Sequence, residues 1–366
     1  MVALIVETPY QMINGLNLIK NDCKECVLFI KFVEEKSKRL ARDLNVNGIK
    51  EDFIKDVYIF DGKSYVLPGI GKRILYKIRY GRKNVIKFYI PNMNLKYKFN
   101  EVLASRSETS FNIFSPLYTD DVKVSFIEDG IGDYLYSDFL DEGSEYPNSI
   151  KSIEKKLGSR YLVTPQLFKK RARVPIEKLP LLKKETMPKT LFQCFPCGEE
   201  KVHFNRFVYF AQMFDALPIQ TECPRIEKEI YDTVRDVLEE SDLTVKLHPR
   251  SEANVYGSNA VITNTPWEII ALVDEDIDNK VLISMCSGSV FYSKLLCDKE
   301  PYVICVMKLY LPYIYTDSEK DIAEKERTME FIHGVKNSYK NKEKFMIPEN
   351  VEELREMLKN TKQGRV

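Results

Sequence analysis

The fold of this chain is decided by "VALIVETPYQMINGL", residues 2–16. The stretch begins with an uninterrupted apolar run rich in branched side chains, which favour a β-strand. Thr8 and Pro9 follow at once, and they are typical of the N-cap and first position of a helix. The stretch therefore predicts a strand that leads directly into a helix, the first unit of a parallel α/β sheet.

Strand-like runs continue to alternate with amphipathic stretches along the chain. In the first half we expect further strands at 26–32, 57–60, 85–90 and 124–127. In the second half we expect strands at 190–195, 243–247, 260–263, 281–285 and 302–306. Alternation of this kind is typical of parallel sheets with crossover helices, and two series of strands predict two α/β domains.

A proline-rich segment separates the two series. Residues 173–190 contain three prolines, many charges and no sustained hydrophobic period, as in a connection between domains. We therefore expect an N-terminal Rossmann-like domain at 1–180 and a second domain at 181–345. The last segment, 346–366, shows Pro348 and Asn350 before a helical period of apolar residues, so it predicts a C-terminal helix.

Composition indicates a folded chain without a general electrostatic partner. Of its 366 residues, 44% are apolar and 30% are charged, which is enough for full cores in two domains. The 55 basic residues nearly balance the 54 acidic ones, so we expect no overall attraction to nucleic acid or membranes. No apolar run approaches the ~20 residues that span a bilayer, and the first residues lack the basic leader of a signal peptide. We expect a cytoplasmic protein.

Two pairs of cysteines and one acidic segment are the candidates for metal binding. Cys23 and Cys26 form one CxxC pair and Cys194 and Cys197 form another, but the pairs are far apart and each adjoins a strand-like run. Such cysteines are better interpreted as reduced, buried thiols than as zinc ligands. The segment "VDEDIDN", 273–279, is interpreted as a solvated loop. We therefore expect no metal site.

In the second half, polar residues follow a predicted strand in "VKLHPR", residues 245–250. His248, Pro249 and Arg250 come just after the strand, and open parallel sheets bind ligands outside the carboxyl ends of their strands. His248 is therefore placed to meet a ligand. The alternative is a histidine in a turn, with its hydrogen bonds satisfied locally.

Two predicted helix starts follow in the same half. In "TNTPWEII", Glu268 occupies the first turn of a helix, where a carboxylate can bind ribose hydroxyls or merely complement the helix dipole. In "VLISMCSGSVFYSKLL", a strand leads into a helix, and hydroxyls and N–H groups at a helix N-terminus suit a phosphate. Ordinary capping by serine is the alternative. The candidate donor-binding residues there are Ser284, Ser287, Gly288 and Ser289.

The first half contributes "KVSFIEDGIGDYLY", residues 123–136. Glu128 and Asp129 follow a predicted strand, so a carboxylate base at the edge of the sheet fits, although a simple Glu-Asp-Gly turn is the alternative. Near the same edge we expect the residues that begin the first helix. These candidate acceptor-side residues are Thr8, Pro9, Tyr10, Gln11 and Gly130.

Taken in order, these motifs resemble those of a known enzyme family. An acidic-acidic-Gly turn, a His-Pro pair, a Pro-x-Glu segment and a serine cluster follow one another between "TPYQ" at 8–11 and the serines at 284–289. The chain thereby resembles the bacterial sialyltransferases of glycosyltransferase family 52 and the related capsular polysialyltransferases. The serine motif departs from the family pattern, because it reads "CSGS" in place of an uninterrupted serine pair.

The resemblance implies a GT-B-like fold, in which two Rossmann-like domains with parallel sheets face each other across a cleft. CMP-sialic acid would be held mainly by the second domain, and the first would be the acceptor side. The C-terminal helix, 346–366, would pack back on the first domain. The acceptor would be a galactose-containing or sialylated glycan of a capsule or lipooligosaccharide.

Inverting sialyl transfer needs a base for the acceptor hydroxyl and a donor group for the departing phosphate. Asp129 or Glu128 would supply the first and His248 the second, without a metal or other cofactor. In some members the base lies nearer the His-Pro motif, and Asp215 and Glu222 are the candidates there. Which carboxylate serves is left open by the sequence.

Other interpretations remain beside this one. A different GT-B transferase, for another nucleotide sugar or a CDP-glycerol-type polymer, would share much of the same chemistry. Residues 71–99 contain nine Lys or Arg among aromatic residues and no acid, which also suits an anionic polymer or nucleic acid. We interpret them as a basic face for peripheral contact with the inner membrane surface, and expect no nucleic-acid partner. A homodimer is a further expectation.

Overall fold

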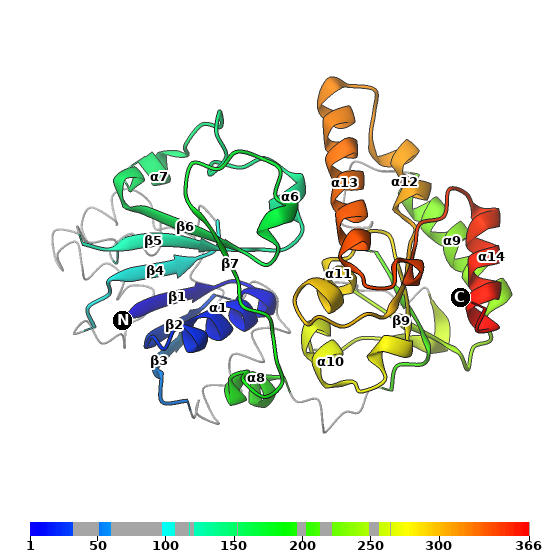
Figure 1. Ribbon diagram of the computed structural model, residues 1–366, viewed down its shortest axis with the longest axis horizontal. Coiled ribbons are helices and arrows are strands. Elements are labelled where there is room, and N and C mark those ends of the chain that lie inside the picture. Colours follow the sequence, from blue (N-terminus) through cyan, green and yellow to red (C-terminus); the bar gives the residue numbers. More distant parts are fainter. Residues whose placement is uncertain are drawn as a thin grey trace. The chain divides into compact units, whose positions relative to one another are not determined.

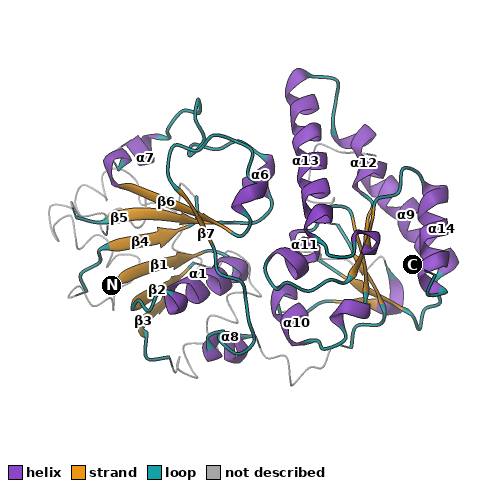
Figure 2. Ribbon diagram, in the orientation of Figure 1, coloured by secondary structure: helices purple, strands orange, loops and turns teal. Residues whose placement is uncertain are grey.

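The computed structural model describes residues 1–31, 51–59, 97–106, 117, 121–151, 153–195, 203–212, 222–248, 256–263 and 265–365. The chain divides into two compact units, Met1–Cys194 and Phe195–Val366, each with its own parallel sheet (Figure 1). Both units combine helices with the strands of their sheets (Figure 2). Within these described ranges, no helix has the length and apolar character that a membrane span requires.

The described part of the first unit forms a seven-stranded sheet in the order β3-β2-β1-β4-β5-β6-β7. The strands are β1 (Val2–Val6), β2 (Cys26–Ile30), β3 (Ile54–Ile59), β4 (Glu101–Ala104), β5 (Lys123–Ile127), β6 (Leu157–Leu162) and β7 (Ile176–Lys178). The helices are α1 (Pro9–Asn21), α6 (Gly132–Leu135), α7 (Asn148–Lys151) and α8 (Lys189–Cys194). All neighbouring strands in this order pair in parallel.

The connection from β1 to α1 is fixed by a capping box. The Thr8 hydroxyl accepts a hydrogen bond from the backbone N–H of Gln11, and the Gln11 side chain accepts one from the N–H of Thr8. Pro9 occupies the first turn, where its missing N–H costs nothing. Further along the helix, Gly15 lies so close to Leu4 of β1 that an added Cβ would stand 2.6 Å from a Leu4 methyl group. The strand and helix predicted from residues 2–16 are both confirmed.

The described part of the second unit forms a six-stranded sheet in the order β10-β9-β8-β11-β12-β13. The strands are β8 (Phe207–Phe210), β9 (Leu243–Lys246), β10 (Ala260–Val261), β11 (Val281–Ser284), β12 (Tyr302–Cys305) and β13 (Phe345–Met346). The helices are α9 (Cys223–Val237), α10 (Trp267–Val273), α11 (Gly288–Leu295), α12 (Met307–Ile314), α13 (Glu319–Ser338) and α14 (Val351–Lys362). In each sheet the chain builds outward from the first strand on one side and then on the other, which is the doubly wound topology.

These two Rossmann-like units confirm the predicted α/β, GT-B-like fold class. Several predicted boundaries change, however. Residues 190–195 were expected to be a strand, but 189–194 form α8, which follows Pro188 and lies outside the sheet. The first unit extends to Cys194, so residues 181–194 belong to it and not to the second domain. The strand predicted at 85–90 and the basic segment up to residue 96 lie outside the described residues.

The C-terminal helix exists as predicted, and its buried apolar residues belong to the core of the second unit. Asn350 caps α14 by accepting a hydrogen bond from the N–H of Glu353 at 2.9 Å. Leu354 and Leu358, both fully buried, join the core of the second unit together with residues of α9. The apolar face of this amphipathic helix therefore packs against the core of its own unit.

The described cysteines are free thiols. Cys26 and Cys194 are buried, and burial raises the pKa of each thiol to about 12. Cys23 is exposed, and Cys197 lies outside the described residues. Within the described ranges, no three His, Cys, Asp or Glu side chains gather in a way that could hold a metal ion.

The close approach of α1 to β1 gives a first prediction. Replacing Gly15 with Val should destabilise the first unit by about 1–3 kcal/mol, because the new side chain overpacks Leu4. Urea unfolding of the purified variant measures this. Gly132→Ala is the matched control, because its Cβ would lie at an ordinary 3.5 Å from Tyr136. Equal stability of the Gly15 variant and the wild type would contradict the close packing described here.

Candidate functional site

The site of the first unit lies at the point where its sheet changes direction. β2 and β4 lie on opposite sides of β1, and in doubly wound sheets ligands bind outside the carboxyl ends of the strands at such a point. Glu7 follows β1, Arg106 follows β4, and Glu128 and Asp129 follow β5. The sequence-predicted carboxylates are therefore at the ligand-binding edge of the sheet.

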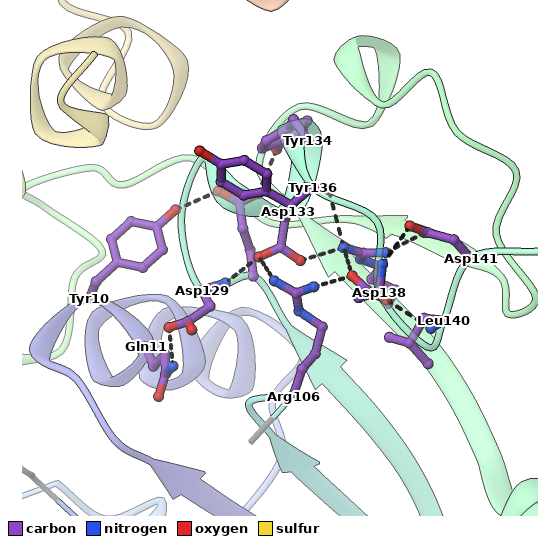
Figure 3. Close-up of polar contacts among 12 residues, drawn as sticks. Tyr10, Gln11, Arg106, Asp129, Asp133, Tyr134, Tyr136, Asp138, Leu140 and Asp141 are labelled. Carbon is purple, nitrogen blue, oxygen red and sulfur yellow. Dashed lines mark hydrogen bonds and ion pairs between the residues drawn. The ribbon is translucent and has the colours of Figure 1, made fainter. Parts of the chain in front are cut away.

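Asp129 is held at this edge from two directions (Figure 3). Its backbone N–H donates to the Asp133 carboxylate at 2.9 Å, and its Oδ1 accepts a hydrogen bond from the side-chain amide of Gln11. Gln11 is fully buried, and its own amide oxygen accepts from the N–H of Glu7 at 2.7 Å. The helix start predicted from "TPYQ" thus positions Asp129 directly.

The environment of Asp129 makes it a stronger base than an ordinary aspartate. The residue is exposed, but the protein atoms around its carboxylate displace water from it, and this desolvation raises its pKa. The negative charge of Asp133 acts in the same direction, while the Gln11 hydrogen bond opposes both, and the resulting pKa is about 6. Such a group is ionised at neutral pH and still basic enough to accept a proton.

Glu128 has a different environment and a different role. Its side chain is fully buried and accepts hydrogen bonds from the hydroxyls of Tyr10 and Tyr134 at 2.7 and 2.5 Å. It also accepts a bond from the backbone N–H of Val163 at 2.7 Å. These bonds engage both carboxylate oxygens of Glu128, whereas the bond from Gln11 engages only Oδ1 of Asp129.

Behind Asp129 lies a network of buried ions that the sequence analysis missed (Figure 3). Arg160 of β6 is fully buried, and its guanidinium contacts Asp133, Asp138 and Asp141 at 2.6, 2.9 and 3.1 Å. Arg106 contacts the other oxygen of Asp133 at 2.9 Å and also pairs with Asp138. Asp133 is thereby fixed between two guanidinium groups while it holds the backbone of Asp129.

The remaining acceptor-side residues contribute to the shape of the site. Thr8 and Pro9 begin α1, and Gly130 has a φ of 128°, a conformation that disfavours other residues directly after Asp129. Tyr10 is half-buried and bonds to Glu128. Of these residues, only Gln11 contacts the Asp129 carboxylate through a bond that the structure shows.

In the second unit, the predicted donor-binding residues lie at the carboxyl ends of β9 and β11 and at the start of α10. His248 is half-buried two residues beyond β9, and Glu268 is buried in the first turn of α10. Ser284 is buried, and its hydroxyl accepts a hydrogen bond from the N–H of Ser287 at 3.1 Å. Ser287 is the N-cap of α11 but its side chain makes no capping bond, so its hydroxyl is not used by the helix.

The predicted donor-binding residues are found on one face of the sheet of the second unit. Leu247 packs into the core with α9, and side chains alternate along a strand, so Lys246 and His248 point to the opposite face. α10 and α11 cover that opposite face and are joined there by a hydrogen bond from the Trp267 indole to Ser293 at 2.9 Å. Glu268 and the half-buried Ser287, Gly288 and Ser289 start these two helices.

Four other predicted residues are less informative. Pro249 and Arg250 lie outside the described residues, as does the alternative base Asp215. Glu222, the other alternative base, is exposed before α9 and forms an ion pair with Arg225 at 2.8 Å. Among the described residues, nothing around Glu222 distinguishes it from an ordinary surface carboxylate.

No protein-family model matches the chain, and no curated protein matches it in sequence. Among solved structures, MurG of Acinetobacter baumannii is 10% identical with a TM-score of 0.43, over 100% of this chain and 90% of that chain. The spinosyn forosaminyltransferase SpnP is 10% identical with a TM-score of 0.44, over 98% of both chains. UGT71G1 of Medicago truncatula, solved with UDP-glucose, is 11% identical with a TM-score of 0.42, over 98% of this chain and 94% of that chain. At these identities the similarity concerns the fold alone.

The raised pKa of Asp129 gives a second prediction. The folded protein binds this proton more tightly than the unfolded chain, in which an aspartate has a pKa of about 3.9. The wild type therefore loses stability as the pH rises from about 4 to about 6, whereas Asp129→Asn does not. The variant should melt at a higher temperature than the wild type at pH 7.5.

Thermal melts between pH 4 and pH 8 test this prediction. The two proteins should melt alike at pH 4, and the difference should grow up to about pH 6 and then stay constant. An Asp129→Asn variant that melts below the wild type at pH 7.5 would show that the ionised carboxylate stabilises the fold.

Proposed function

We propose that the protein is an inverting, metal-independent glycosyltransferase that moves sialic acid from CMP-sialic acid to a hydroxyl group of a glycan acceptor. The observation that carries this proposal is Asp129, a carboxylate with a pKa raised to about 6 at the ligand-binding edge of a doubly wound sheet. The order of the sequence motifs supplies the choice of CMP-sialic acid. The acceptor would belong to a capsule or lipooligosaccharide.

On the acceptor side, Asp129 removes the proton of the attacking hydroxyl. Gln11 holds Oδ1, and within the described part of the chain Oδ2 accepts no hydrogen bond, so Oδ2 is the oxygen available to the acceptor. Because Asp133 fixes the backbone of Asp129, the base is positioned before the acceptor arrives. Proton removal strengthens the oxygen nucleophile as it attacks the oxocarbenium-like anomeric carbon.

On the donor side, negative charge develops on the phosphate of the departing CMP. His248 would donate a hydrogen bond or a proton to this phosphate, and the N-terminus of α11 would stabilise it with backbone N–H groups. The hydroxyls of Ser287 and Ser289 are the candidates for binding this phosphate, and the Ser287 side chain makes no capping bond that would compete. Ser284 acts on the loop instead, since its hydroxyl accepts from Ser287 N–H.

The choice of donor is the first test of this function. With EDTA present, the purified protein should release CMP from CMP-sialic acid and should leave UDP- and GDP-sugars intact. A panel of nucleotide sugars, analysed for the released nucleotide by chromatography, measures this directly. Release of UDP or GDP alone, or strict dependence on Mn²⁺ or Mg²⁺, would favour a different transferase of the same fold.

The base is tested by Asp129→Asn, which keeps the shape of the side chain. We expect kcat to fall by about 10²-fold or more, the usual scale for losing a positioned base. In the wild type, kcat/KM should decline as the pH falls below about 6, because the base becomes protonated. Initial rates of CMP release between pH 5 and pH 8 supply both measurements.

A matched control is Glu142→Gln, which neutralises an exposed carboxylate of the same unit and should keep full activity. An active Asp129→Asn variant would refute the assignment of this base. If Asp215→Asn or Glu222→Gln were inactive at the same time, the base would lie in the second unit and the proposed reaction would stand.

A further inference from the structure

Four lysines in the described part of the chain are buried, and three of them are paired. The Lys31 ammonium contacts Glu7 at 2.6 Å, and Lys294 contacts Asp298 and Glu300 at 2.7 and 2.6 Å. Lys280 donates to the carbonyl of Phe204 at 2.8 Å and lies 3.5 Å from Asp274. Lys246, which is 8% exposed, makes no hydrogen bond or ion pair with any described residue.

A largely buried ammonium group that faces no anion is costly, because burial removes most of its water and the Phe210 ring replaces only part of that stabilisation. Glu268, which is 5% exposed, is the neighbouring counter-charge, yet the two side chains form no ion pair. Burial accordingly lowers the pKa of Lys246 and raises the pKa of Glu268, while their mutual attraction only partly opposes these shifts. The fold keeps two opposite charges near each other without joining them.

The position of Lys246 indicates a reason for this arrangement. It is the last residue of β9, and it points to the same face of the sheet as His248, two residues further on. Its ammonium lies 5.7 Å from the centre of the Phe210 ring, and that ring packs edge-to-face on Trp267, the residue before Glu268. A cation with no ion-pair partner among the described residues therefore lies at the ligand-binding edge, close enough to the predicted ribose-binding carboxylate Glu268 to interact with it electrostatically.

We propose that Lys246 is a phosphate-binding residue of the donor site and that its missing partner is the phosphate of the bound nucleotide. This inference rests on the proposed function, and it adds a cation that the sequence motifs do not include. The ammonium group would neutralise the phosphate charge, while Glu268 would remain available to accept hydrogen bonds from ribose hydroxyls. A nucleotide would thereby separate and satisfy the two buried charges at once.

The test compares nucleotides with their nucleosides, so that only the phosphate differs. Calorimetry would measure the dissociation constants of CMP, cytidine, UDP and uridine for the wild type and for Lys246→Met. We expect CMP to bind about tenfold to a hundredfold more weakly to the variant, with the affinity for cytidine unchanged. Lys246→Gln is a second variant, which retains a polar group if the Met variant does not fold.

Lys280→Met is the matched control, because Lys280 is a buried lysine of the same sheet whose partners belong to the protein. It should lower the melting temperature and leave the ratio of CMP to cytidine affinity unchanged. Lys246→Met should instead lower the affinity for CMP relative to that for cytidine. It should melt at or above the wild-type temperature, since it removes a buried charge that has no ion-pair partner.

The outcomes separate this inference from the proposed function. If CMP binds both proteins equally, Lys246 does not bind phosphate, although the proposed donor stands. If UDP binds in place of CMP and loses affinity in Lys246→Met, the donor assignment fails and the role of Lys246 stands. If none of the nucleotides binds the wild type, both proposals are refuted.

Discussion

The ion pairs that join Arg160 and Arg106 to Asp133 are the interaction on which the proposed site depends. Arg160 is fully buried in β6, so its charge requires the three aspartates around it. Asp133, fixed by these pairs, holds the backbone of Asp129, and its charge adds to the desolvation that is the main cause of the raised pKa of the Asp129 carboxyl group. A structural ion network thus positions the candidate base and contributes to its basicity.

The two candidate sites follow from one property of parallel sheets, which is that the carboxyl ends of all strands meet at one edge. In the first unit that edge carries Asp129, Gln11 and Arg106, and in the second it carries His248 and Lys246. The first set is hydrogen-bonded and ready to accept a proton. The second contains a buried cation that has no ion-pair partner among the described residues, which suits the binding of an anion.

Sequence patterns predicted the elements whose signal is local. The apolar run and Thr-Pro pair of residues 2–16, and the carboxylates after residue 127, needed no tertiary information. β6 was missed because the buried Arg160 interrupts its apolar pattern, and only the distant aspartates make that burial possible. The same reason explains why Glu128 and Asp129 were not distinguished: their different roles come from Tyr134, Gln11 and Asp133, which are brought together by the fold.

The central claim is that Asp133 and local desolvation make Asp129 an unusually basic aspartate. The most direct measurement is the titration of the Asp129 carboxyl carbon by NMR, assigned by comparison with Asp129→Asn. The account predicts a pKa of about 6 in the wild type and a lower value in Asp133→Asn, where the neighbouring negative charge is gone. A wild-type pKa near the ordinary value of about 3.9, unchanged by Asp133→Asn, would contradict it.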